Sequence, residues 1–198
     1  MSWMVWAAAA AAVVAVLFVV FSRASSSSTA AADTYSVGQP GPGQPAPGFT
    51  LPATTGGTVS LSQFRGRTVL LYFQEGITCQ ACWDQLVALD HSTAALRSAG
   101  VDQVVTITTD PVDLLAQKVR DEKINTPVLS DKTVGVSHVY HANSYGMMGT
   151  SRDGHSFVLV GPTGTIRWRA DYGGAPKYTM YVAVPTLLRQ LRAGEIPG

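Results

Sequence analysis

The chain has 198 residues, which allows one ordinary domain with appendages, and 46% of them are hydrophobic, enough for a packed core. Its 14 Lys and Arg against 13 Asp and Glu leave a net charge of +1 without a basic stripe, so we expect no nucleic-acid partner. The two cysteines are too few for a small secreted scaffold held by disulfides or for a zinc site built from cysteine alone.

Residues 1–22 predict a single membrane-spanning helix. Trp3 to Phe21 carries no polar side chain, and at ~1.5 Å per residue it approaches the ~30 Å hydrocarbon thickness of a bilayer. A removable signal peptide is the alternative, with Ala30 to Ala32 as a small-residue cleavage site. We expect a retained anchor, because no Lys or Arg precedes the apolar run and the run is long for a signal peptide. The rest of the chain is then expected on the extracytoplasmic side.

Residues 23–46 predict a flexible linker without a core of its own, because Ser, Ala, Gly, Pro and Gln dominate them. Residues 47–194 alternate between strand and helix signals, which indicates an α/β domain. Within it, Thr58 to Leu61 is a short strand, and the apolar run Val69 to Phe73 is typical of a strand buried on both faces.

A helix is expected next, from Cys79 or Cys82 to Ser98, followed by a β-branched strand over Val101 to Thr108. Asp110 and Pro111 predict the N-cap and first residue of another helix, with Leu114, Leu115 and Val119 as its apolar face. The last elements are a hairpin, from Phe157 to Val160 and Thr165 to Trp168, and a helix that begins near Pro185.

The two cysteines, Cys79 and Cys82, stand three apart between a buried strand and the start of a helix. Such a pair can close a small disulfide ring, and the unpaired N–H groups at a helix start lower the pKa of a thiol. The spacing therefore predicts a reversible redox couple. The alternatives are a structural disulfide or two unrelated buried thiols.

Several short segments, taken in order, resemble the thioredoxin-fold redoxins, in particular the AhpC/TSA family that contains the peroxiredoxins. The matching pieces lie between about residues 46 and 192: Ala46 to Phe49, Leu61 to Gly66, Val69 to Phe73, Pro127 to Asp131, and Ser156 to Val160 with Gly164. The resemblance implies a central mixed sheet flanked by helices, and thiol chemistry that needs no cofactor or metal.

The chain departs from the peroxiredoxin pattern around its cysteines. Aligned on Phe73, Cys82 falls at the peroxidatic position and Cys79 replaces the usual Thr. Gly154 takes the place of the family's arginine, with Arg152 only nearby, and also of the cis-proline of thioredoxins. Missing donors weaken a peroxidase more than a disulfide-exchange enzyme, which needs one accessible thiolate and one resolving thiol.

The leading hypothesis is therefore a membrane-anchored thiol–disulfide oxidoreductase acting on a protein disulfide or thiol. Cys79 attacks the partner, and Cys82 resolves the mixed disulfide. The alternative is a peroxiredoxin-type antioxidant peroxidase, in which Cys82 attacks a hydroperoxide and Cys79 condenses with the resulting sulfenic acid.

Five further residues are candidates to support the pair. Thr78 stands where thioredoxins carry Trp, and Gln85 stands where peroxiredoxins often carry Glu. Trp83 either packs beside the cysteines or caps their disulfide. His155 precedes the strand whose loop should face them, and it is either an imidazole that tunes a thiolate or a surface histidine. Glu75 is either a proton acceptor for a buried thiol or a solvated loop carboxylate.

A second alternative is a redoxin-fold chaperone for Cu(I), which prefers soft ligands. His138, His141, Met147 and Met148 lie close together in the sequence and would join the cysteine pair. The competing interpretation is that the histidines belong to an ordinary connecting helix and the methionines fill space.

Overall fold

A computed structural model describes residues 34–196 of the chain. The strands are β1 (Thr50–Pro52), β2 (Thr58–Ser60), β3 (Val69–Phe73), β4 (Gln103–Thr108), β5 (Val128–Ser130), β6 (Ser156–Val160) and β7 (Ile166–Asp171). The α-helices are α2 (Gln80–Asp90), α3 (Thr93–Ser98), α4 (Val112–Asp121), α5 (Gly135–Val139) and α6 (Val184–Gly194). Short 3₁₀ helices are η1 (Leu61–Phe64), η2 (Ala142–Ser144) and η3 (Gly149–Ser151).

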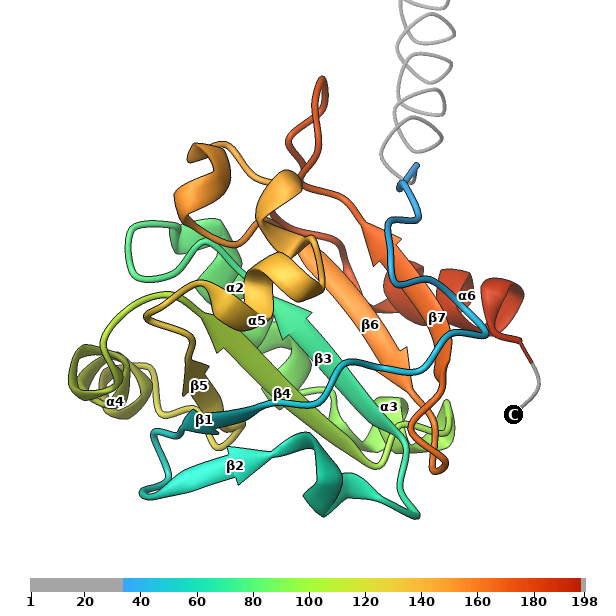
Figure 1. The fold of residues 1–198 in the computed structure, drawn as a ribbon, viewed down its shortest axis with the longest axis horizontal. Coiled ribbons are helices and arrows are strands. Elements are labelled where there is room, and N and C mark those ends of the chain that lie inside the picture. The colour runs from blue at the N-terminus through green and yellow to red at the C-terminus, as the bar shows by residue number, and fades with distance from the viewer. Residues whose placement is uncertain (1–33, 197–198) are drawn as a thin grey trace, which may run out of the picture. The chain divides into compact units, whose positions relative to one another are not determined.

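A mixed five-stranded sheet in the order β5-β4-β3-β6-β7 forms the centre of the domain (Figure 1). Strands β3, β4 and β5 run parallel, and β6 and β7 run antiparallel to their neighbours. Strand β3 lies in the middle and all five of its residues are buried, as the apolar run predicts. A separate antiparallel pair, β1 and β2, precedes it.

The alternation of side chains along β3 divides the core into two layers. Leu70 and Tyr72 pack on one face against α2, α3, α4 and α6, and Leu71 and Phe73 pack on the other. The second face is covered by β1, η1 and the segment around α5, which contributes Tyr140. Figure 1 shows α5 and the β1–β2 pair in front of the sheet and α6 behind it. Both faces of the central strand are therefore sealed from water.

The helix predicted from Cys79 or Cys82 to Ser98 is in fact two helices, α2 and α3, separated at His91 and Ser92. The carboxylate of Asp90 turns out of α2 and accepts hydrogen bonds from Asn125 and Thr126, at 2.7–3.2 Å. Burial opposes its charge, but these donors hold the pKa of Asp90 below its ordinary value. Polar residues of weak helix propensity coincide with the break.

The start of α4 also differs from the prediction. Pro111 is the N-cap and the helix begins at Val112, because the carboxylate of Asp110 is engaged elsewhere. Leu114 is 49% exposed, and Leu115 alone of the helix is fully buried. The predicted apolar face was therefore too wide.

Residues 36–46, here termed the strap, follow the edge strand β7 instead of forming a flexible linker. Ser36 exchanges two backbone hydrogen bonds of 2.9 Å with Asp171, and the amides of Gly43 and Ala46 donate to the hairpin at Ile166 and Gly164. An edge strand offers unpaired backbone groups, and a proline-rich segment can pair with them intermittently. The prediction of a flexible linker does not hold for these residues.

A buried ion pair fastens the strap to β7. Arg169 and Asp171 have fully buried side chains joined at 2.9 Å. The guanidinium also donates to the carbonyl of Pro40 at 3.1 Å, and Asp171 Oδ2 accepts from the amide of Gly38 at 2.7 Å. Each charge thus has both its ionic partner and a strap contact, as buried charges require.

The predicted membrane span, Trp3 to Phe21, lies outside the described residues. Among residues 34–196, no helix combines the length and the apolar character needed to cross a bilayer.

We predict that Arg169→Met lowers the free energy of unfolding by about 3–5 kcal/mol, because Asp171 would be left buried without its counter-charge. Urea denaturation of the full chain measures this loss. The control is Arg167→Met, on the same strand as Arg169. It breaks a partly exposed ion pair with Glu195, which follows α6, and should cost about 0–1 kcal/mol. Equal losses in the two variants would contradict the assignment.

Candidate active site

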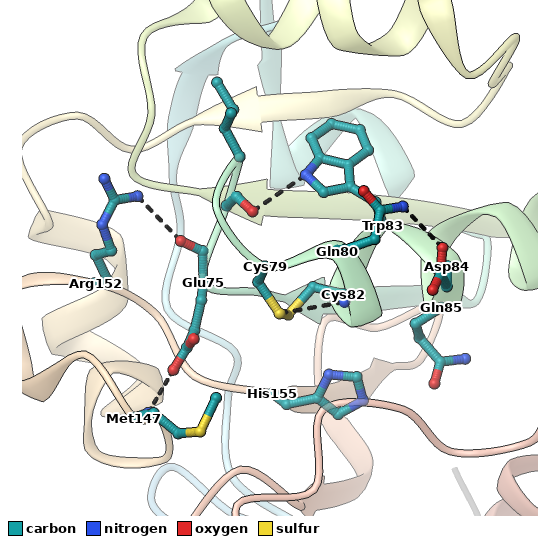
Figure 2. Close-up of a disulfide and its surroundings, with 12 residues drawn as sticks. Glu75, Cys79, Gln80, Cys82, Trp83, Asp84, Gln85, Met147, Arg152 and His155 are labelled. Atoms are coloured by element: carbon teal, nitrogen blue, oxygen red, sulfur yellow. Dashed lines mark hydrogen bonds between the residues drawn. A yellow bond between two sulfur atoms is a disulfide. The ribbon is translucent and has the colours of Figure 1, made fainter.

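The cysteine pair lies where the central strand passes into α2. Cys79 is the N-cap of α2, and Cys82 lies in its first turn. The two form a disulfide with their Cα atoms 5.3 Å apart, and Cys79 Sγ accepts a hydrogen bond of 3.2 Å from the backbone N–H of Cys82 (Figure 2). The same N–H also donates to the carbonyl of Cys79 at 3.1 Å, so the sulfur shares this donor at the start of the helix.

The two sulfur-bearing residues differ in access. Cys79 is 9% exposed, whereas Cys82 is 0% exposed. Met180, from the segment between β7 and α6, packs against both cysteines and covers them. The small exposed surface of the pair therefore belongs to Cys79.

The loop between β3 and α2 is held in place by hydrogen bonds to Asp110 and Arg152. Asp110 Oδ2 accepts from the amide of Ile77 at 2.8 Å. Arg152 Nη1 donates to Asp110 Oδ1 and to the carbonyl of Glu75, both at 3.0 Å. Gly76 allows this approach, because its φ is +95° and an added Cβ would lie 1.8 Å from Asp110 Oδ2. Arg152 thus acts on the backbone that carries the cysteines.

Glu75 is a buried residue, 2% exposed, and not a solvated loop carboxylate. Its Oε1 accepts from the backbone N–H of Met147, which links the cysteine loop to the segment between η2 and η3. In Figure 2, Glu75 lies on the Cys79 side of the disulfide, between Met147 and Arg152.

Gln85 lies inside α2 with no exposed surface. Its Oε1 accepts from the amide of Val182 at 2.6 Å. Because Val182 closely follows Met180, this hydrogen bond holds the covering segment over the disulfide. Gln85 therefore supports the site through a contact to backbone rather than to sulfur.

Trp83 belongs to the core beneath α2 and does not cap the disulfide. Its ring packs in the layer formed with Tyr72 and Leu86, and its indole N–H donates to the carbonyl of Gly76 at 3.1 Å. Thr78 occupies an exposed turn immediately before Cys79. Thr78 therefore lies in the cysteine loop itself. Trp83 lies in the core under this loop and holds it through the hydrogen bond to Gly76.

His155 is fully buried and joined to Cys82 through Tyr72. The Tyr72 hydroxyl donates to the carbonyl of Cys82 at 3.2 Å and lies 3.1 Å from His155 Nδ1. Burial lowers the pKa of His155 to about 3 and raises the pKa of Tyr72 well above its ordinary value, with the Glu75 charge adding to the latter. The local sequence pattern does not point to Tyr72, although this residue carries the one hydroxyl in an otherwise apolar buried strand.

The copper hypothesis needs side chains that lie close together. Among residues 34–196, no three His, Cys, Asp or Glu side chains group closely enough to hold a metal ion. His138 and His141 lie on the surface at the end of α5. Met147 and Met148 are likewise exposed.

Comparison with known sequences connects this site to one family. The pattern described as the AhpC/TSA family matches residues 42–169. The chain is 36% identical over 84 residues to Peroxiredoxin Bcp of Escherichia coli, an alignment covering 42% of this chain and 53% of that protein. It is 33% identical over 111 residues to a putative peroxiredoxin bcp of Haemophilus influenzae, covering 54% and 71%. The match with the first of these relatives thus spans about half of that protein's length.

Solved structures show the same fold at low identity. Peroxidoxin BcpB from Mycobacterium tuberculosis superposes with a TM-score of 0.64 at 20% identity, over 77% of this chain and 96% of that one. A reduced 2-Cys peroxiredoxin from Plasmodium vivax gives 0.64 at 24% identity, over 76% and 94%. The predicted α/β, thioredoxin-like fold is confirmed.

We predict that Gly76→Ala lowers the free energy of unfolding by about 3 kcal/mol or more. The new methyl group would add backbone strain and displace Asp110 from the cysteine loop. Gly57→Ala is the matched control, because Gly57 also has a positive φ, +65°, but no atom within 4 Å of an added Cβ. It should cost about 1–2 kcal/mol. Chemical denaturation distinguishes the two, and similar losses would show that the loop tolerates the methyl group.

We also predict that His155 makes the fold sensitive to acid. The unfolded chain binds a proton at His155 below about pH 6.5, whereas the folded chain does so only near pH 3. Stability from this residue is therefore lost as pH falls from 6.5 to 3, by about 1.4 kcal/mol per pH unit.

The measurement is the slope of unfolding free energy against pH in the parent and in His155→Phe. Asp153, whose pKa is raised well above its ordinary value by burial, has the opposite pH dependence, but it is present in both proteins and cancels in the difference. Parallel slopes would contradict a neutral buried His155.

Proposed function

The chain belongs to the AhpC/TSA family, and from this premise we propose that it is a thiol–disulfide oxidoreductase working through Cys79 and Cys82. The observation that carries the proposal is the disulfide at the start of α2, whose two members differ in exposure. Exchange requires one reachable thiolate and a second thiol within bonding distance of it. The greater exposure of Cys79 supports the first requirement, and the bond between the two sulfurs supports the second.

Cys79 is the nucleophile in this mechanism. Its thiolate, stabilised by the N–H of Cys82, attacks one sulfur of a partner disulfide and releases the other as a thiolate. Cys82 then attacks Cys79 Sγ, which forms the internal disulfide and releases the partner's second thiol. Two electrons pass from the cysteine pair to the partner, and a thiol reductant returns the pair to its starting state.

A peroxiredoxin-type peroxidase is the second candidate, favoured by the relatives that carry the name peroxiredoxin. Cys82 would attack the hydroperoxide and release an alcohol or water, and Cys79 would condense with the sulfenic acid. Three observations count against it as the leading function. Cys82 is fully buried, Cys79 takes the position of the family's Thr, and the guanidinium of Arg152 is committed to Asp110 and Glu75.

We predict that Cys79→Ser lowers the rate of disulfide reduction by at least about 10³-fold, since the attacking sulfur is lost. Cys82→Ser should instead accumulate a mixed disulfide between Cys79 and the substrate, seen as a mass increase that dithiothreitol removes. The assay is reduction of a model protein disulfide by the full chain. If Cys82→Ser rather than Cys79→Ser abolishes reactivity, and hydroperoxide is consumed rapidly by the parent, the peroxidase is correct.

We propose further that residues 1–22 hold the domain at a membrane, with the redox domain on its extracytoplasmic side. The support is the apolar run Trp3 to Phe21. The full chain should remain in the membrane fraction after alkaline washing, and a chain lacking residues 1–33 should not. Recovery of a shortened chain cleaved near Ala32 would establish the signal-peptide alternative.

A further inference from the structure

Met180 covers the disulfide from a segment that has no regular secondary structure. Within residues 34–196, the buried hydrophobic cluster around the sulfurs consists of Cys79, Cys82 and Met180. Met180 is 7% exposed, whereas the next residue, Tyr181, is 46% exposed. The side chain of Met180 is therefore directed inward, onto the pair that the proposed reaction uses.

Residues 173–183, here termed the lid, join β7 to α6. The lid is tightly packed where it begins, because a Cβ added to Gly173 would lie 1.9 Å from the carbonyl oxygen of Tyr145. The amide of Thr179 donates to the carbonyl of Tyr172 at 3.2 Å, which closes a loop. In Figure 1 this part of the chain projects beyond the tip of β7. The lid is thus fixed at its base.

The second part of the lid alternates between buried and exposed residues, as an edge strand does. Met180 and Val182 are buried, and Tyr181 and Ala183 are exposed. The amide of Val182 donates to Gln85 Oε1 at 2.6 Å. A side chain of α2 therefore takes the place that a neighbouring strand would have, and it holds the lid through one hydrogen bond.

The helix that carries the disulfide also holds its cover. Cys82 and Gln85 stand three apart on α2 and share one face of the helix. Neither has any exposed surface. Met180 packs on Cys82, and Val182, two residues further along the lid, binds Gln85. The contact to Gln85 therefore fixes the lid within one helical turn of the sulfur that Met180 covers.

We propose that Met180 determines which reductants and partners reach the disulfide, and that Gln85 is its positioning residue. The proposal rests on the exchange function above and concerns the step in which a dithiol reduces the pair. One thiolate of the reductant attacks Cys79 Sγ, the bond to Cys82 Sγ breaks, and Cys82 leaves as a thiolate. The second thiol of the reductant then displaces Cys79 and forms the reductant's own disulfide, so two electrons enter the pair.

Access to the pair then depends on the size of the attacking molecule. With Met180 in place, a narrow reductant reaches the 9% of Cys79 that is exposed. A bulky molecule must first displace the lid, and its rate is reduced by the fraction of molecules in which the lid is open.

The test is the rate at which the oxidised full chain is reduced by dithiothreitol and by the bulkier tris(carboxyethyl)phosphine, each in excess. Alkylation of the released thiols followed by mass spectrometry counts the reduced chains. Met180→Ala should speed reduction by the phosphine about tenfold or more, and reduction by dithiothreitol by less, because removing the cover favours the larger reagent.

Gln85→Leu should act in the same direction, because the amide of Val182 loses its acceptor. Gln85→Glu should react as the parent does, since a carboxyl oxygen still accepts from that amide. The proposal is overturned if Met180→Ala leaves the ratio of the two rates at the parent's value, or if Gln85→Leu and Gln85→Glu give the same rates.

Met148→Ala is the matched control. It removes the same side chain from a position that is 51% exposed and lies outside the cluster around the sulfurs, and it should leave both rates unchanged. A substitution that loosens the whole fold raises both rates by the same factor. The ratio therefore separates loss of the cover from a general loss of stability.

The measurement uses no partner protein. A changed ratio in Met180→Ala, in a chain whose parent fails to reduce a protein disulfide, would reject the proposed exchange and retain the role of Met180. Exchange by the parent with an unchanged ratio would do the reverse. Met180 lies outside the helices and strands, so Met180→Ala tests the proposal even if Gln85→Leu fails to fold.

Discussion

The carboxylate of Asp110 is the contact on which the geometry of the site depends. Asp110 comes shortly after β4, the strand that runs parallel to β3. Its carboxylate accepts a hydrogen bond from the amide of Ile77, in the loop that follows β3. Arg152 joins the same carboxylate to the carbonyl of Glu75. The loop is thereby fixed on both its amide and its carbonyl side, and α2 starts where Cys79 can cap it. Without this brace, a six-residue connection between a buried strand and a helix has many conformations of similar energy.

Unequal burial of the two sulfurs follows from that placement. Cys79 at the N-cap keeps 9% of its surface exposed, whereas Cys82, one turn into α2, has none. Met180, in the segment that Gln85 holds, packs with both cysteines. The unequal exposure of the two cysteines bears differently on disulfide exchange and on peroxide reduction, the two reactions proposed for this member of the AhpC/TSA family. An exchange enzyme needs its outer sulfur exposed, and a peroxidase acting at Cys82 would have to admit peroxide into a closed core.

The far edge of the sheet is linked to the site by ordinary packing. The guanidinium of Arg169, which fastens the strap, lies 5.8 Å from the centre of the Tyr145 ring. The carbonyl of Tyr145 accepts from the amide of His155 at 2.9 Å. Tyr145 thus contacts both Arg169, which fastens the strap to β7, and the backbone of His155.

The sequence by itself determined the α/β order, the buried strand β3 and the redox pair at the start of a helix, because these follow from apolar periodicity and from residues close together in the chain. The tertiary structure alone decided the burial of Glu75, the use of Asp110 as a brace in place of a cap, the order of the strap and the role of Tyr72. Those features depend on partners far apart in sequence: Asp110 meets Ile77 across 33 positions, Tyr72 meets His155 across 83, and Gly38 meets Asp171 across 133. A polar side chain must find a buried partner wherever folding brings one, and no local pattern states which residue that will be.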